Sequence, residues 1–191
     1  MQLHKPDVVA AAAAILDDYG IADLTMRRLA RELKVSPGAL YWHFANKQQL
    51  LGAVADRVLA AARTDPGPGD WRWRIQTVCG RLRDALLSHT DGAELVSASL
   101  AAGQSRAAAE IVGLLADSAA AAGVHPDHAV LAARTVVYYV LGFTAEEQSR
   151  LQWDAAGAAG ITPDADPGSA FGFGLRLLID GLAVQAGIAV S

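Results

Sequence analysis

Hydrophobic residues recur every three or four positions along most of the chain, which is the spacing of an amphipathic α-helix. Residues 5–19 illustrate it, because Val8, Ala12 and Ile15 fall on one stripe of such a helix. No segment between turn signals alternates apolar and polar residues for long, so strands are not expected. The pattern therefore predicts an all-α fold.

Caps and turn residues divide this pattern into nine expected helices. Ser36-Pro37 combines a preferred N-cap with proline at the first helical position, and Asn46 with Gln49 resembles a capping box. The run from Thr64 to Asp70 interrupts any helix and marks a boundary between two parts of the chain. The expected helices cover residues 5–19, 25–33, 37–44, 47–63, 71–88, 93–101, 105–122, 127–154 and 169–186, with a loop over 155–168.

The two parts differ in charge. The chain of 191 residues is 52% hydrophobic and 19% charged, enough apolar material for a substantial core. Residues 1–63 hold eight lysines and arginines against six carboxylates, whereas residues 64–191 hold eight against fourteen. This asymmetry favours a polyanionic partner for the first part only.

Several features bear on compartment and assembly. The longest stretch without Asp, Glu, Lys or Arg is Val35–Asn46, twelve residues, too short for a transmembrane helix. The N-terminal segment lacks the cleavage site of a secretory signal, and a single cysteine, Cys79, cannot form an internal disulfide. We therefore expect a cytoplasmic protein without a membrane partner.

Residues 169–186 are apolar on several sides, which favours burial against a second copy.

Residues 25–44 form two short helices joined by a turn of about three residues, the layout of a helix-turn-helix. Leu29, Leu40 and Phe44 would supply its core, while basic side chains such as Arg27 and Arg31 face the other way. Residues 24–50 carry five bases against one acid. A solvated helical hairpin would look similar, but such an excess within an acidic chain favours nucleic-acid binding.

Short blocks over almost the whole chain carry the strongest signal. In the first part they are Leu24-Thr25, Leu29-Ala30, Val35-Ser36, Leu40-Tyr41-Trp42-His43-Phe44 and Asn46-Lys47. In the second part they are Ala85–Ala93, Leu141-Gly142 with Glu146-Glu147-Gln148, and Ala170–Leu175 with Gly181-Leu182. Through these blocks the sequence resembles the tetracycline-repressor (TetR) family of bacterial regulators, and the later blocks are similar to the tetracycline repressors themselves.

The resemblance implies two domains and a mode of DNA binding. Residues 1–63 would form a helix-turn-helix DNA-binding domain with its fourth helix as connector, and residues 64–191 a helical ligand-binding and dimerisation domain. A two-fold homodimer would place two recognition helices in successive major grooves of a palindromic, double-stranded operator. The last two long helices would form a four-helix interface between the copies.

The resemblance also assigns DNA-contacting residues. Arg27 matches a base-reading position and can bond guanine through a bidentate fork, and Pro37 and Ala39 suit thymine methyl groups. Trp42 is open to two interpretations, DNA contact or core packing. Lys34 stands where the family usually has glycine, at a cost on the order of 1 kcal/mol if its backbone is left-handed. The DNA-binding candidates are Thr25, Arg27, Arg28, Ser36, Pro37, Gly38, Ala39, Tyr41, Trp42, His43 and Lys47.

The departures from the tetracycline repressors are informative about the effector. Val96 stands in place of their magnesium-coordinating histidine, and Arg63 and Val78 in place of a drug-anchoring histidine and asparagine, so tetracycline is not expected. We expect an apolar cavity for a small hydrophobic effector, with no metal and no cofactor. Its candidate lining is Val78, Leu82, Leu86, Val96, Ser99, Leu100, Tyr138 and Phe143, although several of these would serve equally well as core.

The sequence thus predicts a transcriptional regulator released from DNA by a ligand, most simply a repressor. The chain shows no nucleophile–base pair, phosphate-binding glycine loop or set of metal ligands, so an enzyme is not expected. A constitutive DNA-binding dimer without a ligand, or an activator, are the alternatives. Glu146 and Glu147 match acids of the tetracycline site, but without the histidine we expect them to face solvent or a dimer interface.

Overall fold

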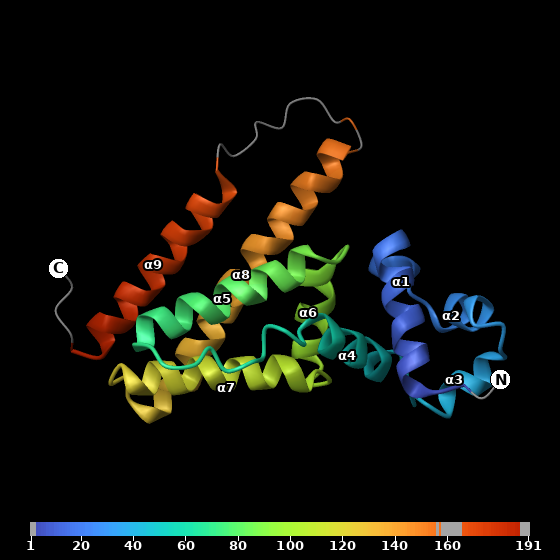
Figure 1. Cartoon of the computed structure of the whole chain (residues 1–191), viewed down its shortest axis with the longest axis horizontal. Coiled ribbons are helices and arrows are strands. Elements are labelled where there is room, and N and C mark those ends of the chain that lie inside the picture. Colours follow the sequence, from blue (N-terminus) through green and yellow to red (C-terminus); the bar gives the residue numbers. More distant parts are fainter. Residues whose placement is uncertain (1–2, 156, 158–165, 188–191) are drawn as a thin grey trace.

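The computed structural model describes residues 3–155, 157 and 166–187, and all regular structure within these ranges is helical (Figure 1). This confirms the predicted all-α fold. The helices are α1 (Lys5–Asp23), α2 (Met26–Glu32), α3 (Pro37–Tyr41), α4 (Lys47–Val58), α5 (Trp71–Leu87), α6 (Gly92–Ala101), α7 (Arg106–Ala121), α8 (Pro126–Ala155) and α9 (Pro167–Gln185).

Side-chain caps begin the short helices where the sequence predicts them. Thr25 Oγ1 accepts a hydrogen bond from the N–H of Arg28 at 3.1 Å, which starts α2. Ser36 and Asn46 cap α3 and α4 in the same way. Each cap satisfies an N–H that has no partner inside its helix.

Two predicted boundaries differ from the structure. Gly20 has φ 78° and ψ 174°, so it kinks the chain inside α1, which continues to Asp23, and is not the C-cap of a helix ending at Tyr19. Helix α4 ends at Val58, because the turn that follows buries Leu59 in the core and leads the chain away. Of the predicted loop 155–168, residues 156 and 158–165 lie outside the described residues.

The first four helices form a head at one end of the molecule (Figure 1). Helices α1, α2 and α3 surround Leu16, Leu29 and Leu40, each completely buried, and Phe44, which is 1% exposed. Helix α4 packs on α1 within the head and on α6 and α7 beyond it. It is therefore the connector between the head and the remaining helices, which we call the body.

The body is built around α8, which packs against α5, α6, α7 and α9. Within the described residues, α8 is the one helix long and apolar enough to cross a membrane, with a mean hydropathy of 1.2 over 18 residues. Its contacts with four neighbours are those of a core helix. Figure 1 shows the second half of α8 and most of α9 projecting side by side from the body.

Candidate nucleic-acid interface and ligand pocket

The turn between α2 and α3 is tight and carries one strained residue. The N–H of Val35 bonds to the carbonyl of Ala30 at 2.9 Å, and the N–H of Lys34 to that of Arg31 at 3.1 Å. This is a Schellman ending, which requires a left-handed residue, and Lys34 adopts it with φ 55°. Lys34 therefore meets the condition under which the sequence assigned a backbone cost to this turn.

Helix α3 presents its aromatic residues to solvent. Leu40 and Phe44 are buried in the head, whereas Tyr41 is 52% exposed and Trp42, the C-cap of α3, is 91% exposed. The alternative that Trp42 packs in the core is therefore wrong. Pro37 and Gly38 are also exposed at the start of α3.

The two arginines of α2 have different surroundings. The Arg28 guanidinium lies 3.6 Å from the centre of the Tyr19 ring and pairs with the carboxylate of Asp23. Arg28 is thus held against the end of α1. Arg27 is exposed, and within the described residues it makes no ion pair or side-chain hydrogen bond. Its donors remain available to a base.

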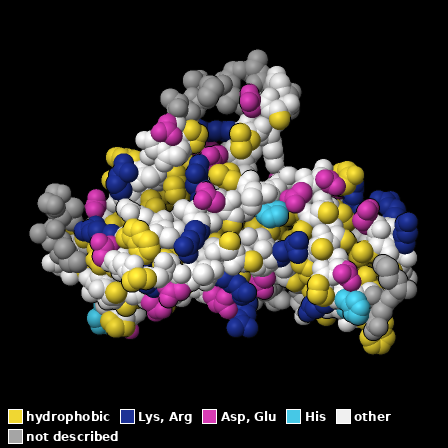
Figure 2. Space-filling model, viewed as in Figure 1, with side chains coloured by type: hydrophobic (Ala, Val, Ile, Leu, Met, Phe, Trp, Pro, Cys, Tyr) yellow, Lys and Arg dark blue, Asp and Glu magenta, His cyan; other side chains and the backbone are white. Residues whose placement is uncertain are grey.

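The remaining DNA-binding candidates lie on the same region of the head. Thr25 and Ser36 accept hydrogen bonds as caps, while their hydroxyl protons stay available. Ala39, His43 and Lys47 are half-buried between the exposed positions. Figure 2 shows Lys and Arg side chains gathered at the outer edge of the head. Helix α4 begins at Lys47, and the amides of a helix N-terminus favour a phosphate.

Helix α4 is docked on the turn between α6 and α7. A Cβ at Gly52 would lie 2.2 Å from the carbonyl oxygen of Gln104, so only glycine allows this approach. Asp56 Oδ1 accepts hydrogen bonds from Ser105 Oγ at 2.7 Å and from the N–H of Ala107 at 2.9 Å. Close packing at Gly52 and two hydrogen bonds to the carboxylate of Asp56 therefore join α4 to the turn at residues 104–107.

An ion-pair cluster continues this contact. Glu110 pairs with Arg106 at 2.8 Å and with Arg63 at 3.1 Å. The hydrogen bond from Arg106, together with the charge of Arg63, lowers the pKa of Glu110. Arg63 is thus engaged with α7.

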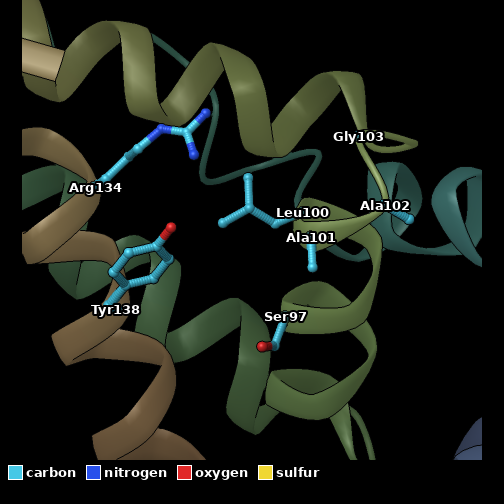
Figure 3. A pocket seen from close by; sticks show the side chains of 7 residues that line it. All are labelled: Ser97, Leu100, Ala101, Ala102, Gly103, Arg134 and Tyr138. Atoms are coloured by element: carbon cyan, nitrogen blue, oxygen red, sulfur yellow. The ribbon is translucent and has the colours of Figure 1, made fainter. Parts of the chain in front are cut away.

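A pocket of about 540 Å³ opens between α6 and α8, next to the same turn (Figure 3). Leu100 and Tyr138 are the two predicted effector residues among its lining. The lining residues are Ser97, Leu100, Ala101, Ala102, Gly103, Arg134 and Tyr138. The turn that closes one side of the pocket, residues 102–103, leads directly into Gln104, which contacts α4.

The structure does not bring the other predicted effector residues to this pocket. Val78, Leu82, Leu86 and Val96 are at most 1% exposed and pack in the core of the body. Ser99 is buried with its hydroxyl lacking a hydrogen-bond partner, as is Thr144 on α8, among the described residues. No group of three potential metal ligands occurs within the described residues.

Phe143 belongs instead to an aromatic cluster that holds α9 on α8. Its ring lies 5.9 Å from Tyr139 and 5.5 Å from Phe171, centroid to centroid. The hydroxyl of Tyr139 donates a hydrogen bond to the carbonyl of Phe171 at 2.8 Å. Desolvation raises the pKa of Tyr139.

Glu147 does not face solvent, which was one of the two positions expected for it; the other was a dimer interface. Its carboxylate forms a bidentate ion pair with Arg83, whose Nε and Nη2 donate hydrogen bonds of 3.0 and 2.6 Å to the two carboxylate oxygens. Both side chains are about 15% exposed. The Arg83 guanidinium also lies 5.2 Å from the centre of the Phe171 ring. Glu146, by contrast, is exposed as expected, and it pairs with Arg150.

Five of the seven lining residues were not predicted from the sequence, and Arg134 is the charged one among them. It lies four residues before Tyr138 on α8, so both side chains share one face of that helix. This spacing is the signal that could have found it.

Known protein families match both parts of the chain. The family model of bacterial regulatory proteins, tetR family, matches residues 8–54. The model of the tetracyclin repressor-like C-terminal domain matches residues 63–167.

Individual relatives agree with these matches. The tetracycline repressor protein class A from transposon 1721 of Escherichia coli is 34% identical over 202 residues, covering 95% of this chain and 91% of that protein. The crystal structure of Mycobacterium smegmatis BioQ is 67% identical with a TM-score of 0.92, covering 96% of this chain and 99% of that one. BioQ bound to its natural double-stranded DNA operator is 65% identical with a TM-score of 0.86, covering 95% and 99%.

Proposed function

The chain belongs to the tetR family of bacterial regulatory proteins, and we propose that it is a homodimeric repressor that leaves its operator when a small molecule binds the body. It is a DNA-binding transcriptional regulator and not an enzyme. We assign residues 1–63 to DNA binding and residues 64–191 to ligand binding and dimerisation. Its place of action is the cytoplasm, where its operator is.

In this proposal α3 lies in the major groove and α2 crosses above it. Arg27, exposed and without a protein partner among the described residues, bonds guanine O6 and N7. Pro37 and Ala39 contact thymine methyl groups, and the exposed Tyr41 and Trp42 contact the sugar-phosphate backbone. Arg28 contributes by holding α2 against α1 through Tyr19 and Asp23.

The homodimer uses the projecting halves of α8 and α9. These helices expose large hydrophobic side chains, and Figure 2 shows hydrophobic side chains in the region between them. The exposed residues there are Leu151 and Trp153 on α8, with Phe173, Leu177 and Val184 on α9. Such a surface is typical of a protein–protein interface. In a two-fold dimer, two α8–α9 pairs form a four-helix bundle.

The observation that carries ligand responsiveness is the position of the pocket. Its lining residues Ala102 and Gly103 precede Gln104, whose carbonyl oxygen packs against Gly52 of α4. A ligand that reshapes this turn therefore displaces α4 and, with it, the DNA-binding head. Coupling between such sites typically amounts to about 1–3 kcal/mol.

Tetracycline is not the proposed effector. Val96 is fully buried and offers no metal ligand at the position of the histidine, while Arg63 is paired with Glu110. A magnesium–drug chelate would lack its protein ligands at these positions.

DNA binding is tested by fluorescence anisotropy with the operator duplex of the 65% identical relative and with a scrambled duplex of equal length. We expect one dimer per palindrome. Arg27→Ala should cost about 1–3 kcal/mol on the operator and much less on scrambled DNA. Equal losses on both duplexes would show that Arg27 only contacts phosphates.

Ligand release and dimerisation need separate experiments. Footprinting of the DNA that flanks the protein's own gene, repeated with candidate ligands, should show protection that an effector removes. A ligand that binds tightly but leaves the footprint unchanged would contradict release.

Leu177→Glu on α9 should give monomers in light scattering after size exclusion, because it places a charge in the apolar interface. A dimer that survives this change would move the interface elsewhere.

A further inference from the structure

We propose that the effector is an organic anion, an apolar molecule with a carboxylate or comparable acidic group, whose charge is held by Arg134. This inference rests on the proposed function, since it takes the pocket between α6 and α8 as the effector site. It narrows the expected hydrophobic effector to one chemical class.

Arg134 lies in the pocket with its charge uncompensated. Figure 3 shows its guanidinium and the Tyr138 ring extending from α8 into the space that faces Leu100. Other arginines of the body, such as Arg83 and Arg106, pair with carboxylates. Arg134 has no ion pair or side-chain hydrogen bond with any described residue, so its five donors are available to a ligand.

The other polar side chains of the pocket also suit an acceptor. Tyr138 and Ser97 each carry a hydroxyl that can donate a hydrogen bond, and the lining includes no carboxylate. A guanidinium binds a carboxylate in a bidentate, charge-assisted geometry. Leu100 and Ala101 supply the apolar side. The lining is therefore complementary to a molecule with an acidic end and an apolar body.

The C-terminus of α6 at the pocket edge would repel an anion if its carbonyls were free. Three of them are engaged, because the carbonyls of Ala98, Ser99 and Leu100 accept hydrogen bonds from the N–H groups of the three residues that follow Ala101. The bond lengths are 3.0, 2.9 and 3.1 Å. This Schellman ending leaves the positive charge of Arg134 dominant in the pocket.

Two fluorescent probes that differ by one anionic group test the proposal. These are 8-anilino-1-naphthalenesulfonate (ANS) and N-phenyl-1-naphthylamine, which shares its rings but lacks the sulfonate. Each is titrated into the full-length wild type, Arg134→Gln and Arg31→Gln. Arg31 is an exposed arginine of the head, so the last variant loses the same charge far from the pocket.

We expect ANS to bind the wild type and Arg31→Gln alike, and Arg134→Gln to bind it at least about ten-fold more weakly. Binding of the neutral probe should be equal in all three proteins. The proposal is overturned if Arg134→Gln binds ANS as tightly as the wild type does. It is also overturned if the affinity of Arg134→Gln for the neutral probe falls by the same factor as its affinity for ANS. Arg134 is exposed, and circular dichroism should show Arg134→Gln folded like the wild type.

Operator affinity in the same samples tests the proposed function separately. ANS binding that depends on Arg134 while operator affinity stays constant supports the anion site and contradicts ligand-driven release. Operator release by ANS in both the wild type and Arg134→Gln supports release and overturns the anion site.

Discussion

The carboxylate of Asp91 accepts a hydrogen bond from the backbone N–H of Ile21 at 2.9 Å, joining the first helix of the head to the start of α6. Its other oxygen accepts a bond from Gln152 Nε2 of α8 at 2.7 Å. A Cβ at Gly20 would lie 2.6 Å from Asp91 Oδ2, so the kink glycine of α1 is what allows the approach. One side chain thus links α1, α6 and α8.

Removing this link should loosen the head from the body. Asp91→Ala leaves a part-buried N–H without a partner, and we expect it to lower the free energy of unfolding by about 1–3 kcal/mol. Asp91→Asn is the matched control, because it keeps one acceptor oxygen and tolerates the left-handed backbone, φ 52°, of this residue. Urea denaturation measures both variants. Equal stability of Asp91→Ala and the wild type would show that the bond contributes nothing in solution.

Lys34 offers a test of backbone strain. Lys34→Gly relieves the left-handed backbone at φ 55°, and we expect it to raise the unfolding free energy by about 1 kcal/mol, or Tm by about 2–4 °C. Lys34→Ala removes the same charge but keeps the Cβ, so it should not give this gain. Calorimetry that shows the two variants equally stable would attribute any effect to charge.

The contact between Gly52 and Gln104 should be needed for communication as well as for stability. Gly52→Ala forces a Cβ against a backbone carbonyl, so we expect lower stability and an altered operator affinity as α4 shifts. Gly113→Ala on α7 is the control, because its Cβ would meet nothing within 4 Å, and it should be neutral or stabilising. Fluorescence anisotropy measures the operator affinity of the two variants, and thermal melts measure their stability. Normal operator affinity in Gly52→Ala would place the coupling elsewhere.

Cys79 gives a prediction of pH dependence. Its side chain is fully buried, and burial raises the pKa of the thiol. The unfolded chain loses this proton above about pH 8.5 while the folded chain keeps it, so the contribution to stability is complete below that pH and declines above it. Relative to Cys79→Ala, the wild type should lose about 1.4 kcal/mol per pH unit above 8.5. Parallel pH profiles in urea denaturation would contradict this.

The helices were predictable from the sequence because their signals are local. Thr25, Ser36 and Asn46 cap the helices that they were expected to cap, and these caps depend on residues only three positions away. Gly20 was misread because glycine permits several positive-φ conformations. Here the kink accompanies a close approach to Asp91, which is distant in sequence and which no local pattern indicates.

The site was predictable only in part, for a similar reason. Hydrophobicity could not separate pocket lining from core, so Val78 and Leu82 were grouped with Leu100 and Tyr138 although they are buried on α5. Glu147 was expected to face solvent or a dimer interface, because the sequence does not reveal that Arg83 on α5 faces it. Which side chains of different helices meet depends on how the helices pack, and the local sequence pattern does not determine this.

The most direct test of the account is the linkage between the pocket and the operator. Binding free energies are reciprocal, so a ligand that releases DNA must itself bind more weakly to the DNA complex. The measurement is the affinity of ANS for the free protein, for protein saturated with operator duplex and for protein mixed with scrambled duplex. We expect ANS to bind the operator complex about 5–150-fold more weakly than the free protein, and to bind with unchanged affinity in the presence of scrambled DNA. Equal ANS affinity with and without the operator would contradict it.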